Sequence, residues 1–419
     1  MATLAYAIEI TETGNIVLLE GIHNASNLNS DKTLNISGEA NAIIDATKSN
    51  RILYIYENGD VTLSNIKMIN GYSTESGALL GNAGKLTLRN TTLSDSVSNN
   101  NGGAIYNVGT LSIIDCIFKN NIANLGGAIY SGGNYKEDLN IEILNTVFDG
   151  NTALGNANNK GGGAIYAQAS SGNFIVNNVT FKNNKAGKYG GGALYAMQLD
   201  NIRISDSQFI NNSAEVNEYY GGGAIAVIGG NYQREGTTTI TNTLFENNNA
   251  DMSGGAIFLK GTTLDISNSV LFNSDDANGI VIYSAPTVNS VNSKITANDN
   301  WWGSNDNPKK FVSKVSTVTL NRWTILTVEN DTEIVPGNNV NIAVSLTNYT
   351  TGSVNGTLSK PITIKRNVSL QTSFEEFNGI LENGKYNISY SIPAGLKLIS
   401  AAVDGQTIIL YVVESQASI

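Results

Sequence analysis

Apolar and polar residues alternate along most of this chain in short runs separated by Gly and Asn. This two-residue period is typical of β-strands. One such phrase recurs eight times between residues 57 and 275, each time around a single Asn or Asp. The central residues are Asn65, Asn90, Asp115, Asn145, Asn178, Asp206, Asn242 and Asn268. Mostly apolar residues stand four and two positions before each of them, and a large apolar residue stands three positions after it. No stretch shows a clear 3.6-residue period, so we expect little helix.

A second phrase, Gly-Gly-Ala followed by an aliphatic residue, alternates with the first. Its copies begin at Gly102, Gly126, Gly162, Gly191, Gly222 and Gly254. Repeats of this length indicate stacked units, because one unit cannot bury its own apolar face whereas several stacked copies form a continuous core. We therefore predict an all-β fold, namely a right-handed parallel β-helix solenoid of about ten coils with one coil per repeat.

Stacking also explains which residue types recur. Equivalent residues of adjacent coils lie ~4.8 Å apart, so stacked Asn side chains can pass amide hydrogen bonds along the rod. Asn also tolerates the left-handed backbone of a sharp corner. We expect the large apolar residues to form one interior stack, with Leu271 rather than Phe272 at the last position. Its aromatic members are Phe118, Phe148, Phe181, Phe209 and Phe245.

Two domains are predicted, because the sequence pattern changes near residue 312. Residues 1–311 are assigned to the β-helix, with an N-terminal cap within residues 3–20 and a C-terminal plug at Trp301-Trp302. The alternative for the two Trp residues is a carbohydrate-binding platform. In residues 312–419 the repeat vanishes and strand-like runs recur at a spacing of about 8–12 residues, which favours an Ig-like β-sandwich.

Composition excludes several classes of function. The formal net charge is −10 and no basic cluster is present, which argues against nucleic-acid binding. A single Cys, Cys116, and a single His, His23, exclude disulfide frameworks and His/Cys metal sites. We interpret the thiol as packing or surface filler and the imidazole as a solvated loop residue. Carbonyl- and Asp-rich turns could hold calcium, although any metal site is unknown, and no other cofactor is expected.

No apolar run has the length of a membrane span, and residues 1–10 lack the pattern of a signal peptide. We expect a monomeric fragment of a longer extracellular protein, from which the signal peptide and the anchor are absent.

A column of Tyr residues is the first candidate binding surface. It consists of Tyr106, Tyr130, Tyr166 and Tyr195, with Ala226 and Phe258 at the next two positions. Because the aliphatic residue before each of them should point inward, strand alternation directs these rings outward. Stacked Tyr faces suit sugar rings, since the ring is apolar and the hydroxyl polar. The alternative is a ladder that only shields the coil.

Two similar insertions are the second candidate surface. Each reads Gly-Gly-Asn-Tyr, and their candidate ligand-binding residues are Asn134, Tyr135, Asn231, Tyr232 and Arg234. Binding residues concentrate on loops that a rigid scaffold holds in place. Ordinary drift of loop sequences is the alternative for each insertion alone.

The recurring phrases resemble a known repeat. Gly-Gly-Ala-Ile-Tyr, as in Gly102–Tyr106, together with Phe-x-Asn-Asn, as at Phe118, resembles the repeat of the chlamydial polymorphic outer-membrane proteins. The segment from Trp301 to Pro308 is similar to the adhesin-like surface proteins of methanogenic archaea, which share this repeat. The resemblance implies a cell-surface or cell-wall location and an adhesin role, and it carries no catalytic motif.

Three functions are compatible with these features: a cell-surface adhesin, a structural stalk, and a polysaccharide lyase or hydrolase. A glycosidase needs two carboxylates ~5–9.5 Å apart. Asp115 and Asp206 lie three coils apart in the Asn column, which is ~14 Å at strand spacing. We therefore predict a non-enzymatic adhesin fragment that binds a glycan or a protein on the surface of another cell.

Overall fold

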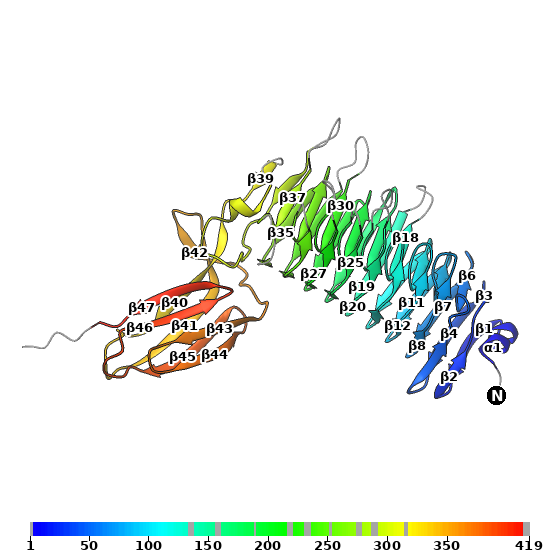
Figure 1. Cartoon of the computed structure of the whole chain (residues 1–419), viewed down its shortest axis with the longest axis horizontal. Helices are drawn as coiled ribbons and strands as arrows, with labels where there is room; N and C mark the ends of the chain where they lie inside the picture. The colour runs from blue at the N-terminus through cyan, green and yellow to red at the C-terminus, as the bar shows by residue number, and fades with distance from the viewer. Residues whose placement is uncertain are drawn as a thin grey trace, which may run out of the picture.

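The computed structural model describes residues 3–132, 138–155, 161–187, 190–215, 221–229, 236–250, 254–273, 279–285, 292–313 and 317–413. It has a long stack of parallel strands that continues into two small antiparallel sheets (Figure 1). Each coil contributes one strand to each of three long sheets, here called A, B and C, and central coils add a fourth strand. The prediction of an all-β parallel solenoid is confirmed.

Sheet A contains, in spatial order, β1 (Thr13–Leu18), β4 (Thr33–Gly38), β7 (Asp60–Ser64), β11 (Lys85–Arg89), β15 (Thr110–Ile114), β19 (Asp138–Leu144), β23 (Ser171–Asn177), β27 (Asn201–Ser205), β31 (Thr237–Thr241), β35 (Thr263–Ser267), β38 (Lys294–Thr296) and β39 (Thr317–Thr319). Sheet B contains β2 (Gly21–Asn24), β5 (Ala42–Asp45), β8 (Lys67–Ile69), β12 (Thr92–Ser94), β16 (Ile117–Lys119), β20 (Val147–Asp149), β24 (Thr180–Lys182), β28 (Gln208–Ile210), β32 (Leu244–Glu246) and β36 (Val270–Phe272).

Sheet C contains β3 (Leu28–Ser30), β6 (Leu53–Ile55), β10 (Leu80–Asn82), β14 (Ile105–Asn107), β18 (Ile129–Gly132), β22 (Ile165–Gln168), β26 (Leu194–Met197), β30 (Ile225–Ile228), β34 (Ile257–Lys260) and β37 (Ile282–Ser284). The short strands of the fourth sheet are β9 (Tyr72–Ser73), β13 (Val97–Ser98), β17 (Ile122–Ala123), β21 (Thr152–Ala153), β25 (Lys185–Ala186), β29 (Ser213–Ala214) and β33 (Asn249–Ala250).

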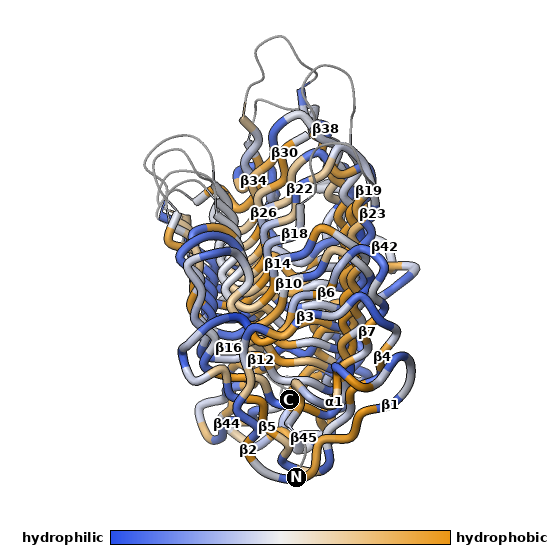
Figure 2. The backbone as a smooth tube through the Cα atoms, turned by 90° about the vertical axis from the view of Figure 1, so that its right-hand side faces the viewer, coloured by the Kyte–Doolittle hydropathy of each residue, from blue (hydrophilic) through white to orange (hydrophobic). Residues whose placement is uncertain are grey.

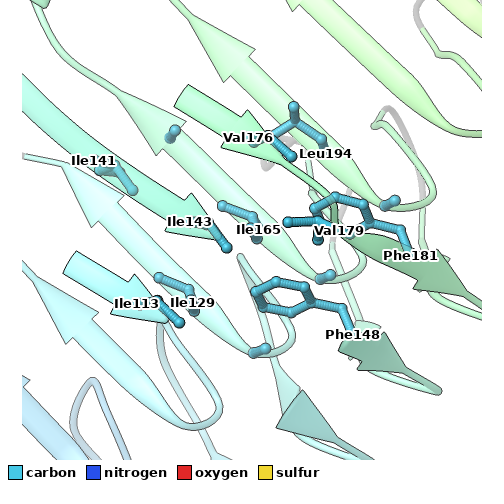
Figure 3. Close-up of a cluster of buried hydrophobic side chains, with 14 of the residues drawn as sticks. Ile113, Ile129, Ile141, Ile143, Phe148, Ile165, Val176, Val179, Phe181 and Leu194 are labelled. Carbon is cyan, nitrogen blue, oxygen red and sulfur yellow. The ribbon is translucent and has the colours of Figure 1, made fainter. Parts of the chain in front are cut away.

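The interior of the rod is a continuous apolar core. Apolar residues recur at the same place in successive coils (Figure 2), and side chains from sheets A, B and C meet inside (Figure 3). The five predicted Phe rings lie in one stack, with centroids 4.8–5.0 Å apart and interplanar angles of 4–9°. Leu271 pairs with Phe245 and is buried, whereas Phe272 is only half-buried. The predicted register is therefore confirmed.

A ladder of buried amides runs beside the Phe stack. Its rungs are Asn121, Asn151, Asn184, Asn212 and Asn248. At each step an Nδ2 donates to the Oδ1 of the next coil at 2.9–3.0 Å, and the backbone N–H of the same residue donates to that oxygen too. Each Nδ2 also donates to a backbone carbonyl of the preceding coil, such as that of Phe148 for Asn184. Both amide protons therefore have partners, as burial of a polar group requires.

The recurring Asn/Asp column forms a second, outer ladder at the corner between sheets A and B. All eight residues have a positive φ, between 46° and 57°. Asn90 donates to Asn65 at 2.8 Å, and Asn178 donates to Asn145 at 2.8 Å. Both roles that the sequence assigned to this column, the left-handed corner and the side-chain ladder, are present.

The Gly-Gly corner has two separate steric causes. Gly126 has φ +62°, a conformation that costs glycine little. A Cβ on Gly127 would lie 2.1 Å from the carbonyl oxygen of Gly163 in the next coil. The first glycine therefore permits the turn, and the second permits the coils to approach each other.

The N-terminal end of the stack is covered by helix α1 (Leu4–Ile10) beside β1 (Figure 1). Leu4 and Ile8 of this helix are buried in the main core, and the Thr3 hydroxyl accepts from the backbone N–H of Tyr6 as an N-cap. Lys32 donates to the carbonyls of Ile8 and Glu9 at the end of the helix.

The two adjacent Trp residues serve two different cores. Trp302 is 3% exposed, belongs to the main core, and stacks on Phe311 of the 3-10 helix η1 (Pro308–Phe311). Trp301 is fully buried and faces the C-terminal sheets, where its Nε1 donates to Asp404 at 2.8 Å. Burial of both rings rules out the alternative of an exposed carbohydrate platform.

Parallel pairing continues to β39, a few residues beyond residue 311.

The C-terminal part has two four-stranded antiparallel sheets around a shared core. One contains β40 (Trp323–Asn330), β41 (Asn339–Thr350), β42 (Asn355–Thr357) and β45 (Lys385–Ser391), and the other contains β44 (Glu376–Leu381), β43 (Arg366–Gln371), β46 (Leu398–Val403) and β47 (Gln406–Tyr411). The Ig-like assignment stays a prediction.

A buried arginine joins the two parts. The side chain of Arg366 is 8% exposed and contacts Asp404 at 2.5 Å and Glu246 of the rod at 3.0 Å. Leu244, Val270 and Trp301 of the last coils complete the apolar junction. Moving the C-terminal sheets away from the rod would separate Arg366 from Glu246. This is unfavourable, because it would leave a buried charge without one of its partners.

We expect Asn184→Ala to destabilise the rod strongly, by about 1–3 kcal/mol for each buried group left without a partner. The matched control is Asn178→Gly in the outer ladder, where glycine tolerates the φ of +53° and the expected loss is about 1 kcal/mol or less. Urea unfolding followed by circular dichroism measures both. Equal losses in the two variants would contradict a dominant role for the buried ladder.

We expect Phe209→Ala to cost about 3–5 kcal/mol, because the ring fills a slot between two stacked neighbours and its removal leaves a cavity. The adjacent Gln208 is exposed, and Gln208→Ala should change the free energy of unfolding by about 0.5 kcal/mol or less. The same unfolding experiment compares them, and an unaffected Phe209→Ala variant would disprove the assigned core.

Candidate binding surfaces

The Tyr column forms a stacked ladder on the outer side of sheet C. The centroids of neighbouring rings are 5.1–5.5 Å apart and the interplanar angles are 7–11°, along the series Tyr106, Tyr130, Tyr166 and Tyr195. The rings lie outside the main core, as strand alternation predicted. They continue into a separate apolar cluster that contains Ala226 and Phe258. The ladder ends at Tyr106 because Gly81 occupies the next position.

Two of the four rings have little surface left for a sugar, and the role of the column in binding stays a prediction. Tyr166 is 6% exposed and Tyr195 is 1% exposed. Both faces of Tyr130 and Tyr166 are occupied by neighbouring rings. At the spacing between coils, the next ring is the partner that best covers an aromatic face. Burial also raises the pKa of Tyr195. The alternative interpretation, a ladder that shields the coil, accounts for this geometry.

Except for the first glycine of each, the two Gly-Gly-Asn-Tyr insertions lie outside the described residues. Asn134, Tyr135, Asn231, Tyr232 and Arg234 all fall within those gaps, so their part in binding stays a prediction. The structure does place the point from which each insertion starts: Gly132 ends β18, and Gly229 directly follows β30, both on sheet C.

The outer face of sheet A carries a hollow that the sequence did not reveal. Its volume is about 420 Å³ and it spans β15, β19, β23 and β27. One side is a row of exposed amides, in which Asn201 donates to Asn173 and Asn173 donates to Asn140, each at 3.1 Å. A second row of lining residues runs beside the amides, one residue from each strand: Ser112, Glu142, Ile175 and Arg203.

Local strand length places these side chains. β19 and β23 have seven residues each, whereas their neighbours β15 and β27 have five. A Cβ on Gly172 would lie 2.1 Å from the carbonyl of Leu139, so glycine permits the added ends of the two strands to pack closely. Strand alternation then directs Asn173 and Ile175 to the outer face while Phe174 enters the core.

Two other hollows are already committed to structural contacts. One of about 570 Å³ lies over the outer corner ladder near Asn65 and Asn90. The other, about 660 Å³, lies at the junction beside Glu246, Arg366 and Asp404, whose charges pair with one another. Of these three hollows, all lined by described residues, the one on sheet A is the candidate site that remains open to a ligand.

The lining of the hollow holds few groups that could act as an acid or a base. Among the described residues that line the hollow, Glu142 is the sole carboxylate, whereas a glycosidase requires two. Asp115 and Asp206 instead accept hydrogen bonds from Asn145 and Asn242 in the corner ladder. In the part of the chain that the structure describes, no group of three or more His, Cys, Asp or Glu residues could hold a metal ion.

Four segments of the chain match a repeat described as the Chlamydia polymorphic membrane protein repeat: residues 115–132, 145–168, 178–197 and 242–260. Each segment begins at a corner residue of the Asn/Asp column and ends at the last residue of a sheet C strand. The matched unit therefore corresponds to most of one coil. The resemblance to chlamydial repeats is supported, and the similarity to archaeal adhesin-like proteins stays a prediction.

Two relatives of known name share part of this sequence. A probable autotransporter, YfaL, of Escherichia coli (strain K12) is 33% identical over 148 residues, which cover 33% of this chain and 11% of that protein. A probable outer membrane protein, pmp1, of Chlamydia pneumoniae is 38% identical over 109 residues, which cover 24% of this chain and 12% of that protein. The chain thus aligns with about a tenth of each relative. No solved structure gives a significant match.

Among the described residues the longest helix, α1, has seven residues, so none is long and apolar enough to cross a membrane.

Cys116 should be an unreactive thiol. It is 1% exposed, and its Sγ donates to the carbonyl of Ile114, as the hydroxyl of Thr146 does to Leu144 one coil later. Burial raises the pKa of the thiol from 9.0 to about 11. We expect alkylation of the folded protein at pH 8 to be far slower than in urea, because the thiolate is the nucleophile.

The same shift predicts a pH dependence of stability. The pKa of Cys116 is higher in the folded protein than in the unfolded chain. The contribution of this buried thiol to the free energy of unfolding is therefore fully present below pH 9, and it is lost as the pH rises toward 11. Cys116→Ser should remove this loss while preserving the hydrogen bond. Rapid alkylation of the folded wild type at pH 8 would contradict the assignment.

Proposed function

We propose that this chain is part of a surface-exposed, passenger-type rod that binds glycans or proteins of other cells and does not transform them. The repeats are similar to those of polymorphic membrane proteins, and the two relatives are a probable autotransporter and a probable outer membrane protein. These similarities support a cell-surface location. We infer the adhesin role and the absence of catalysis from the surface of the rod.

The observation that carries the binding role is the open hollow on sheet A. Inside the rod, the buried Asn side chains hydrogen-bond to one another along the ladder. The exposed row of Asn140, Asn173 and Asn201 instead borders an open hollow about 420 Å³ in volume. This volume lies within the range of small-molecule sites. A stalk has no need for such a site, and a hydrolase would need a second carboxylate in it.

Retention on surfaces tests this function directly. We expect beads coated with the chain to bind cells or immobilised glycans, and we expect no release of reducing or unsaturated sugar from a polysaccharide panel. Beads that carry an unrelated acidic protein are the control, because they match the negative charge. Retention no greater than this control would favour the stalk, and released sugar would establish an enzyme.

A further inference from the structure

We propose that the hollow on sheet A binds an uncharged oligosaccharide that lies across β15, β19, β23 and β27, parallel to the rod axis. This inference rests on the proposed function, because it identifies the ligand class of an adhesin and the surface that receives it. It replaces the Tyr column as the binding surface, since the faces of those rings are largely occupied by their neighbours.

The amide row supplies regularly spaced donors and acceptors. An Asn side chain has two N–H donors and an oxygen with two lone pairs. Within the row, Asn173 uses one donor toward Asn140 and one lone pair toward Asn201. All three side chains are exposed, so each rung has capacity left for a ligand. The rungs repeat at ~4.8 Å, which is comparable with the length of one pyranose residue in a chain.

The second row supplies an apolar contact between two charges. Ile175 is half-buried and lies between Glu142 and Arg203, which stand two coils apart at ~9.6 Å. Neither charged group has an ion pair within the described part of the chain. The aliphatic side chain suits the C–H face of a sugar ring, while the carboxylate and the guanidinium can bind hydroxyl groups on either side.

Charge favours an uncharged ligand. Glu142 and Arg203 cancel within the hollow, and the whole chain has a formal net charge of −10. A polyanionic polysaccharide would therefore meet long-range repulsion without a compensating basic patch. The hydroxyl groups of a neutral oligosaccharide match the donors and acceptors that line the hollow.

An added peptide strand fits this face poorly. Strand addition requires an unpaired backbone edge. β19 pairs with β15 and β23, and β23 pairs with β19 and β27, so the backbone under the hollow is already paired on both sides. The side chains above the sheet, rather than its edges, must provide recognition, and their polar and aliphatic mixture favours a sugar.

The test compares wild type with Asn173→Ala/Arg203→Ala on panels of immobilised neutral and anionic oligosaccharides. We expect wild type to bind neutral members, and the double variant to bind them at least about tenfold more weakly, because it loses one amide and one charged hydrogen bond. The matched control is Thr62→Ala/Thr87→Ala, at the same outward column on β7 and β11, which should stay within about twofold of wild type.

Ile175→Thr gives a second variant that keeps a β-branched residue in the strand. It should weaken binding to neutral oligosaccharides while the thermal unfolding temperature stays close to that of wild type. Binding confined to anionic members, or binding that both variants leave unchanged, would overturn the proposal. If the rod still adheres to cells while no oligosaccharide is bound, the site fails and the adhesin function stands. If wild type does not adhere at all, the proposed function itself fails.

Discussion

The amide ladder inside the rod fixes how each coil stands on the next. A parallel sheet on its own tolerates a slip of two residues without exchanging its faces. The ladder does not tolerate it, because each buried Asn oxygen must meet both a side-chain and a backbone donor from the neighbouring coil. A slipped coil would leave these groups buried without partners, at about 1–3 kcal/mol each. The register that follows puts Phe over Phe, Tyr over Tyr and corner Asn over corner Asn.

The same register determines which surface can change. Where the same residue type stacks in successive coils, its side chains stabilise the rod and are covered by one another. In the Tyr ladder the rings cover each other, and few ring faces remain for a ligand. On the outer face of sheet A the equivalent residues differ from coil to coil, in the order Ser112, Glu142, Ile175, Arg203 and Thr239. A rod built from near-identical coils can therefore hold a specific site where its repeats diverge. The junction at Arg366 then anchors the C-terminal sheets to the last coils.

Local pattern was enough to predict the core, because each interior position follows from alternation within one coil. Leu271, rather than the larger Phe272, enters the core for this reason. The roles of adjacent identical residues were harder to predict. Asn120 has a φ of +55° and is exposed, whereas Asn121 is buried in the ladder. Trp301 and Trp302 belong to two different cores, because Trp301 faces the C-terminal sheets, which sequence alternation cannot position. The hollow was missed because its lining comes from four coils.

Side-chain amide exchange tests the central claim most directly. In hydrogen-exchange NMR of the folded protein, the Nδ2 protons of Asn121, Asn151, Asn184, Asn212 and Asn248 should exchange as slowly as the core backbone amides. Those of the exposed row Asn140, Asn173 and Asn201 should exchange rapidly. Rapid exchange of the buried set would show that the amides do not form a closed ladder, and that the register of the rod depends on something else.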